Sequence, residues 1–380
     1  MIDTSQKEVV DLLVSHSGMS ILISQKCQED PFSRSAEKTT AWATKQAKKA
    51  FSQLRGALRG VEAKRSVWCD HRRRGRVEFP DGLPFINHAI VIVEVFERVE
   101  LGPESDFPLA LNGIPVTYLS VNDFLNLAQE LRTLPEMSEY LEARRSLSKT
   151  ALRTVGDDKT LYEYYLGNDG SFQECVDHVS AKEFATNNGD QLKMARAAKA
   201  ESDRFSKLIE YIADQLATRL ADYASGLPAD ILAAFDDPGD RKQYIQMQDI
   251  LANLRLRERA ELGRAFSQSV EALKSQLEGY VYRALYFDTR PDLVFVLASS
   301  KGVARREVLE RGLVLTRAAM AHYEKSRAML IVDRDGSGFE VSMIESASVP
   351  TEEEIVAGKR FFGSLRVIDR AYSFARSSDL

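Results

Sequence analysis

Cysteine and long apolar runs are scarce in this sequence. The 380 residues include only three cysteines, far apart, and no CxxC pair. Such cysteines are typical of free thiols in a reducing compartment. The sequence has no signal-peptide pattern and no apolar run long enough to span a bilayer. We therefore expect a soluble, cytoplasmic protein without a membrane partner.

Several well-known catalytic motifs are also missing. The sequence contains no GxxxxGK[ST], no GxSxG and no HExxH, which leaves P-loop ATPase and metalloprotease chemistry without support. The formal net charge is −5, so overall charge does not indicate nucleic-acid binding. A local basic face is what phosphate contact requires, and the first half of the chain contains basic clusters.

The composition is that of a globular protein with a sizeable core. Hydrophobic residues make up 44% and charged residues 28% of the chain, which are ordinary values. The patterning predicts three regions. These are a mixed α/β domain over 1–150, a mainly helical region over 151–276, and an α+β region over 277–380.

The first region follows the order β-β-α-β-β-α. Apolar, β-branched runs at 9–14 and 19–24 flank a short glycine-containing turn and predict a hairpin. Apolar residues recur every three or four positions over 39–59 and predict a helix. Further strands are expected at 86–95 and 115–119, with more helices behind them. The segment 61–84 has the composition of a loop.

Two charged residues stand out on the predicted hairpin. Asp11 interrupts an apolar strand, and Lys26 ends the next one. Ser24 shares a strand face with Lys26, because side chains alternate along a strand. Glu8 precedes Asp11 by three residues. Carboxylates that hold Mg²⁺, beside a group that orients water, are what metal-dependent phosphodiester cleavage needs.

The segments 7–14, 21–26 and 53–59 together resemble the PD-(D/E)XK nuclease-like family of bacteria, including uncharacterised members found around mobile and defence genes. The resemblance implies a mixed-sheet, restriction-endonuclease-like core flanked by helices. It also implies a nuclease, acting on DNA rather than RNA, with Mg²⁺ or Mn²⁺ held by Asp11 and Glu8. Lys26 and Gln53 would complete the catalytic set.

Basic residues near this set are candidates for contact with phosphates. They lie on the predicted helix and in the segment that follows it. The candidates are Lys45, Lys49, Arg55, Arg59, Arg72, Arg73 and Arg74. The predicted helical region is a candidate surface for a protein partner.

Two alternatives stay open at this point. The family has an acid where this chain has Ser24, and a hydroxyl is a poor replacement for a metal-binding carboxylate. The fold would then serve as a catalytically degenerate binding or assembly module. A second alternative is an unrelated α/β protein, which a purely parallel sheet would favour.

Overall fold

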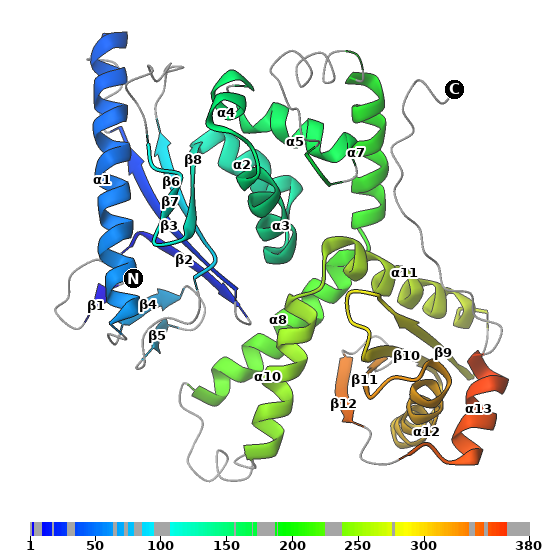
Figure 1. Ribbon diagram of the computed structural model, residues 1–380. Coiled ribbons are helices and arrows are strands. Elements are labelled where there is room, and N and C mark those ends of the chain that lie inside the picture. Colours follow the sequence, from blue (N-terminus) through cyan, green and yellow to red (C-terminus); the bar gives the residue numbers. More distant parts are fainter. Residues whose placement is uncertain are drawn as a thin grey trace. The chain divides into compact units, whose positions relative to one another are not determined.

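The computed structural model divides the chain into two compact units. Unit 1 comprises Met1–Ala197 with Tyr372–Leu380, and unit 2 comprises Ala198–Ala371. Each unit is described by itself (Figure 1). The residues that the structure describes are 2–3, 10–16, 19–28, 35–63, 67–71, 75–79, 86–94, 107–155, 157–168, 170–172, 187, 189–224, 238–275, 278–333, 339–345 and 349–362.

Unit 1 is built on a five-stranded mixed sheet. Its strands are β2 (Leu12–His16), β3 (Met19–Cys27), β6 (His88–Glu94), β7 (Ala110–Leu111) and β8 (Ile114–Ser120), in the order β2-β3-β6-β8-β7. β2 and β3 are antiparallel, whereas β3, β6 and β8 run parallel to one another. The β2–β3 hairpin is found as predicted, although β2 begins at Leu12, so Asp11 lies just before the strand. The sheet is mixed, so the purely parallel arrangement that would favour an unrelated α/β protein is not observed.

The long helix α1 (Ala36–Glu62) connects β3 to the strands that follow and covers one face of the sheet (Figure 1). Its buried stripe includes Ala47, Ala50 and Leu54, which pack with Leu22 of β3 and other residues of the same face. The stripe recurs at the helical period, so the apolar residues of α1 meet the sheet and its polar residues face outward.

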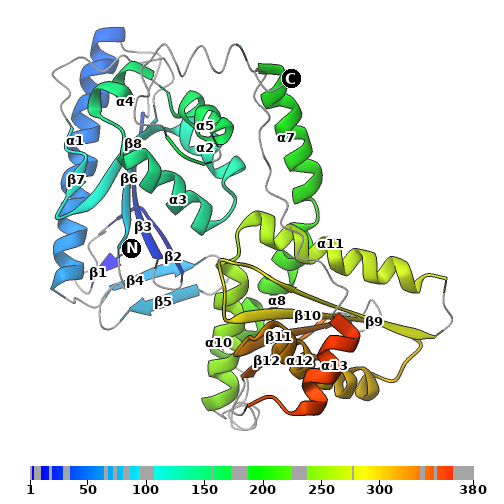
Figure 2. The same ribbon diagram turned by 45° about the vertical axis from the view of Figure 1, so that its right-hand side comes forward.

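Helices cover the opposite face of the same sheet. They are α2 (Val121–Glu130), α3 (Leu134–Arg145) and α5 (Asp158–Gly167), as Figure 2 shows. Ile21 and Ile90 point to these helices, because side chains alternate along each strand. Unit 1 also contains α4 (Lys149–Val155), and the division between the units falls within α7 (Gly189–Asp203), after Ala197.

The prediction that 61–84 forms a loop is wrong. This segment contains β4 (Val67–His71) and β5 (Gly75–Phe79), which are antiparallel and form a small sheet with β1 (Ile2–Asp3). β-branched and aromatic residues on both sides of a short basic segment favour a hairpin. The run of arginines in the sequence obscured that signal, and the pairing with β1 is remote in sequence.

Unit 2 has a four-stranded mixed sheet in the order β12-β11-β10-β9. The strands are β9 (Gly279–Tyr286), β10 (Leu293–Lys301), β11 (Arg327–Asp333) and β12 (Phe339–Glu345). β10 and β11 are parallel, and the two outer strands are antiparallel to their neighbours. β9 was not predicted from the sequence; its side chains are partly buried, except for the exposed Tyr280.

Two layers of helices enclose this second sheet. α12 (Arg305–Tyr323) packs on one face, with α13 (Glu352–Phe362) against it. α8 (Ser206–Ala224), α10 (Pro238–Ala252) and α11 (Leu256–Leu273) cover the other face. The helices expected as a separate region over 151–276 are therefore divided between the units, because α8, α10 and α11 share one apolar core with the C-terminal sheet. None of the helices in the described part of the chain could cross a membrane.

Candidate functional site

The hairpin of unit 1 brings Asp11 against the second half of β3. Leu12 pairs with Ile23 across the hairpin, so Asp11, one residue earlier, lies beside Ser24. Ser24 is fully buried and lies on the same face of β3 as Leu22, which packs against α1. The site is therefore positioned by the register of β2 on β3 and by the packing of α1.

One carboxylate oxygen of Asp11 collects three donors. Asp11 Oδ2 accepts from the backbone N–H of Gln25 at 2.7 Å, from Ser24 Oγ at 2.9 Å and from Lys26 Nζ at 3.3 Å. The side chains of Lys26 and Asp11 are 16% and 22% exposed. The structure thus brings together Asp11 and Lys26, the two residues at the centre of the sequence prediction.

These donors determine the protonation of Asp11. Burial acts to raise its pKa, and the hydrogen bonds from Gln25 and Ser24, together with the charge of Lys26, outweigh that effect and lower the pKa. Donors that satisfy a charged carboxylate favour the charged form. Asp11 is therefore an anion at neutral pH, as a metal ligand must be.

Gln53 reaches the same cluster from α1. Ser24 Oγ lies 3.1 Å from Gln53 Oε1 and 2.9 Å from Asp11 Oδ2. A hydroxyl has a single proton, so it donates to only one of these oxygens at a time. Turning the amide, whose oxygen and nitrogen are assigned from the network, lets Gln53 donate to Ser24 while Ser24 donates to Asp11.

The remaining predicted residues are not part of this cluster. Glu8, Arg72, Arg73 and Arg74 lie outside the described residues. Four cations are exposed on α1, away from the sheet; they are Lys45, Lys49, Arg55 and Arg59.

The oxygens around Lys26 offer a partial fit to a divalent cation. In the described residues, no group of three or more His, Cys, Asp or Glu side chains is placed to hold a metal. However, Lys26 Nζ donates to Gln25 O at 2.9 Å as well as to Asp11 Oδ2, so two oxygens converge on one cation. Mg²⁺ keeps several waters and needs as few as one or two carboxylates from the protein. Asp11 and the Gln25 carbonyl could hold such an ion.

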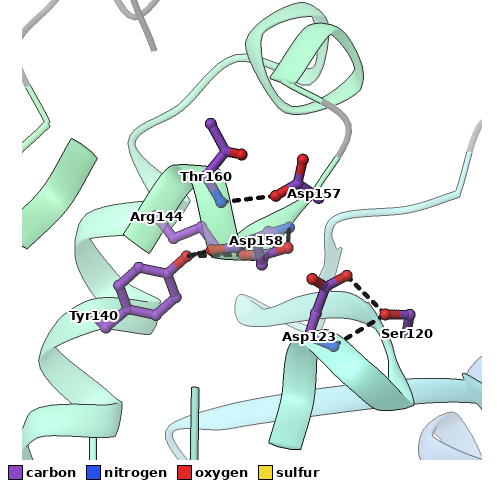
Figure 3. Close-up of polar contacts among 7 residues, drawn as sticks. All are labelled: Ser120, Asp123, Tyr140, Arg144, Asp157, Asp158 and Thr160. Carbon is purple, nitrogen blue, oxygen red and sulfur yellow. Dashed lines mark hydrogen bonds and ion pairs between the residues drawn. The ribbon is translucent and has the colours of Figure 1, made fainter. Parts of the chain in front are cut away.

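A second polar cluster lies among the helices on the other side of the sheet (Figure 3). Asp158 accepts from Arg144 Nε at 2.6 Å and from Arg144 Nη2 at 2.9 Å, and Tyr140 Oη donates to it at 2.9 Å. All three residues are buried. Sequence reasoning missed this cluster, because α5 was not predicted. Its groups satisfy one another, so its role is to join helices.

Two helix caps accompany this cluster in Figure 3. Ser120 accepts from the backbone N–H of Asp123 and donates to its carboxylate, and Asp157 accepts from the N–H of Thr160. Burial raises the pKa of Asp123; the hydrogen bond from Ser120 opposes this, and Asp158 adds to it. The caps begin α2 and α5 and satisfy backbone donors that have no helical partner.

A hollow of about 520 Å³ opens at the start of β6. His88 lines it, is 4% exposed, and has no hydrogen-bond partner for Nδ1 among the described residues. Burial lowers the pKa of His88, an effect that nearby Glu142 opposes and Arg145 reinforces. His88 shares a strand face with Ile90, which packs toward α2 and α3. The hollow is therefore separate from the Asp11 site.

The chain was also compared with known proteins. It matches no protein-family model, no curated protein and no solved structure. The function proposed below is therefore argued from the residues of the chain itself.

Proposed function

We propose that the protein is a Mg²⁺- or Mn²⁺-dependent nuclease that hydrolyses phosphodiester bonds of DNA rather than RNA. The observation that carries the proposal is the convergence of Asp11, Ser24, Lys26 and Gln53 on one face of β3. A lysine and an anionic carboxylate at a partly exposed position form the core of a metal-assisted hydrolytic site.

The order of the elements supports a restriction-endonuclease-like core of the PD-(D/E)XK type. The hairpin β2–β3 is followed by the helix α1, by β4 and β5 of the small sheet, and then by β6, which is parallel to β3. Within the five-stranded sheet this gives the β-β-α-β order that the sequence pattern predicts. It places the acid, the lysine and the helical glutamine on elements that pack directly against one another.

Each residue has a distinct role in the proposed mechanism. Asp11 holds the divalent cation, with Glu8 as the second carboxylate that the resemblance implies. A bound Mg²⁺ would neutralise charge on the phosphate and lower the pKa of a bound water. Lys26, now shared between Asp11 and the Gln25 carbonyl, orients the attacking water or stabilises the developing negative charge.

Gln28 supports a substrate site next to Lys26. It directly follows β3, is 2% exposed, and its Nε2 has no hydrogen-bond partner among the described residues. A buried amide donor without an acceptor costs about 1–3 kcal/mol. A phosphate oxygen of a bound substrate would satisfy it, and Gln53 would position substrate or water from the other side.

The first test is cleavage of labelled duplex DNA by the purified protein with MgCl₂ or MnCl₂. We expect cutting that EDTA abolishes and that Asp11→Asn reduces by at least a factor of 10³, since this variant keeps the shape of the side chain but loses the charge. Glu142→Gln, at an exposed position on α3, is the control and should cut normally. Equal cutting by Asp11→Asn and the wild type would refute the proposal.

A second function is favoured by one observation. Ser24 replaces the carboxylate that the family has two residues before the lysine, and the described site contains one carboxylate alone. The fold would then be a catalytically degenerate module that binds nucleic acid or a protein partner. Binding of duplex DNA without cutting, at any tested Mg²⁺ or Mn²⁺ concentration, would favour this reading.

A further inference from the structure

We propose that the outer face of α1 binds the phosphate backbone of double-stranded DNA and holds it beside the cutting site. Nucleic acid as the ligand rests on the proposed function. Between positions 38 and 61 the sequence has no acidic residue. The same stretch contains six basic residues, all of them exposed: Lys38, Lys45, Lys48, Lys49, Arg55 and Arg59.

The six cations form a single stripe. At about 100° per residue they fall within an arc of roughly 120° on the helix surface. This arc lies opposite Ala47, Ala50 and Leu54, which are buried against the sheet. With a rise of about 1.5 Å per residue, the stripe from Lys38 to Arg59 is about 31 Å long. We refer to these six side chains as the basic stripe.

The basic stripe differs from the surfaces of the other helices. Several cations on those helices, or just after them, pair with an acid three or four residues away in sequence. These pairs are Arg145–Glu142, Lys193–Asp190, Lys199–Asp203, Arg204–Glu201, Arg264–Glu261, Lys274–Glu271, Arg306–Glu310 and Arg311–Glu307. No residue of the basic stripe forms an ion pair with another described residue. Within the described part of the chain, no carboxylate neutralises the basic stripe, and a polyanion would supply that negative charge.

The contacts of Arg55 are with uncharged groups. Its Nη2 lies 3.5 Å from Ser52 Oγ, and its guanidinium stands 5.9 Å from the centre of the Phe51 ring. Neither contact neutralises the charge. The six cations of the basic stripe repel one another, and a bound polyanion would relieve that repulsion.

Duplex DNA fits the basic stripe better than other polyanions. The stripe is close in length to one turn of the double helix, about 34 Å. The aromatic residues of α1, Trp42 and Phe51, are partly buried, whereas surfaces for single strands stack bases on exposed aromatic rings. None of the large apolar side chains exposed in the described part of the chain lies on α1, so this helix lacks the apolar face that membrane insertion needs.

The basic stripe and the cutting site occupy different sides of α1. Gln53 lies roughly 100° around the helix from the middle of the stripe, and it contacts Ser24 of the site. Lys49, one turn before Gln53, is the stripe residue nearest in angle to it. The stripe therefore holds duplex that flanks the reacting phosphate, so binding and cutting are separable.

The test measures binding of a fluorescent duplex of about two turns by anisotropy, in EDTA, over a range of salt concentrations. Lys45→Gln/Arg55→Gln should weaken binding roughly 10- to 100-fold near 0.1 M salt and reduce the slope of log K against log salt by about 1.8. The matched control is Arg306→Gln/Arg311→Gln, which removes the same charge from α12, where both arginines are paired. It should bind as the wild type does.

Because the measurement excludes metal, it is independent of cutting. If the wild-type protein does not cut DNA but its binding is weakened by Lys45→Gln/Arg55→Gln, the proposed nuclease activity is contradicted and the basic stripe stands as a DNA-binding face. If the protein cuts DNA and Lys45→Gln/Arg55→Gln changes neither cutting nor binding, the proposal for the basic stripe is overturned and the proposed nuclease activity stands. Equal binding to a single strand of the same length, or tighter binding to phosphatidylserine vesicles through the same residues, would overturn duplex DNA as the ligand.

Discussion

In the proposed nuclease, a second metal-binding carboxylate would be expected at the position of Ser24, which shares the face of β3 with Lys26. In this chain it is a fully buried hydroxyl whose Oγ lies 2.9 Å from Asp11 Oδ2. A carboxylate at that position would stand beside Asp11, and two adjacent carboxylates repel each other unless a cation or a proton lies between them. Ser24 therefore allows the hairpin to fold with a charged Asp11 whether or not a metal is bound.

Ser24→Asp should make the stability of unit 1 depend on metal. Without a divalent ion, we expect a loss of roughly 1–3 kcal/mol from burial of a second charge beside Asp11. Millimolar MnCl₂ should restore much of that loss and raise the melting temperature. Ser24→Asn, similar in size and uncharged, is the control and should not respond to metal. Thermal unfolding with and without MnCl₂ measures both, and an Asp variant indifferent to MnCl₂ would argue against a cation site at Asp11.

At the scale of elements, the buried Tyr140–Arg144–Asp158 cluster joins α3 to α5 (Figure 3). Burial acts to lower the pKa of Arg144, but the charge and hydrogen bonds of Asp158 outweigh it and raise that pKa. Arg144 therefore stays charged and depends on Asp158. Removing one partner of a buried ion pair leaves the other charge buried without compensation.

Asp158→Asn should destabilise unit 1 by roughly 3–5 kcal/mol, because it leaves Arg144 charged and buried. Replacing both partners, in Arg144→Met/Asp158→Leu, should cost less than the single change, since no charge then remains. Arg145→Gln removes a neighbouring cation that is 53% exposed and should shift stability by no more than about 0.5 kcal/mol. Urea unfolding measures all three, and an Asp158→Asn variant as stable as the wild type would contradict the role of the cluster.

At the scale of the whole molecule, the main sheets of the two units are built in a similar order, although β4 and β5 intervene between helix and third strand in unit 1. In unit 2 the hairpin β9–β10 is followed by α12 and by β11, which is parallel to β10. β10 ends in Ser299-x-Lys301, as β3 carries Ser24-x-Lys26 near its end. However, Ser299 shares a strand face with Leu297, which packs toward α11 rather than toward the following helix α12. Val281 stands opposite Ser299, where unit 1 has Asp11. Unit 2 therefore repeats the arrangement without the site.

Each unit has its own core, so changes in one core should leave the other unaffected. A methyl group at Gly263 would overlap the backbone carbonyl of Phe205, whereas nothing lies within 4 Å of a methyl group at Gly56. Gly263→Ala should destabilise unit 2 by about 2 kcal/mol or more. Gly56→Ala, at an exposed position inside α1, should stabilise unit 1 by about 0.5–1 kcal/mol.

Hydrogen exchange resolved by peptide tests this pair of variants. Amides of α11 should exchange faster in Gly263→Ala, and amides of α1 should exchange more slowly in Gly56→Ala. Each variant should leave the peptides of the other unit unchanged. Faster exchange of α1 in Gly263→Ala would mean that the two cores are not independent in stability.

The sequence by itself determined the parts of this protein that depend on local patterns. The β2–β3 hairpin, the long helix α1 and the strands β6 and β8 follow from periodicity and turn residues. The proximity of Asp11 and Lys26 follows from hairpin register. These features need few contacts between distant residues, so their signals are complete within short segments.

Only the tertiary structure decided what depends on distant residues. It brought Gln53 of α1 to Ser24, paired β4 with β1, joined Arg144 to Asp158, and placed α8, α10 and α11 on the C-terminal sheet. Backbone groups such as the Gln25 amide and carbonyl also became site atoms only there. Every residue has these groups, so the folded register alone selects which of them face a site.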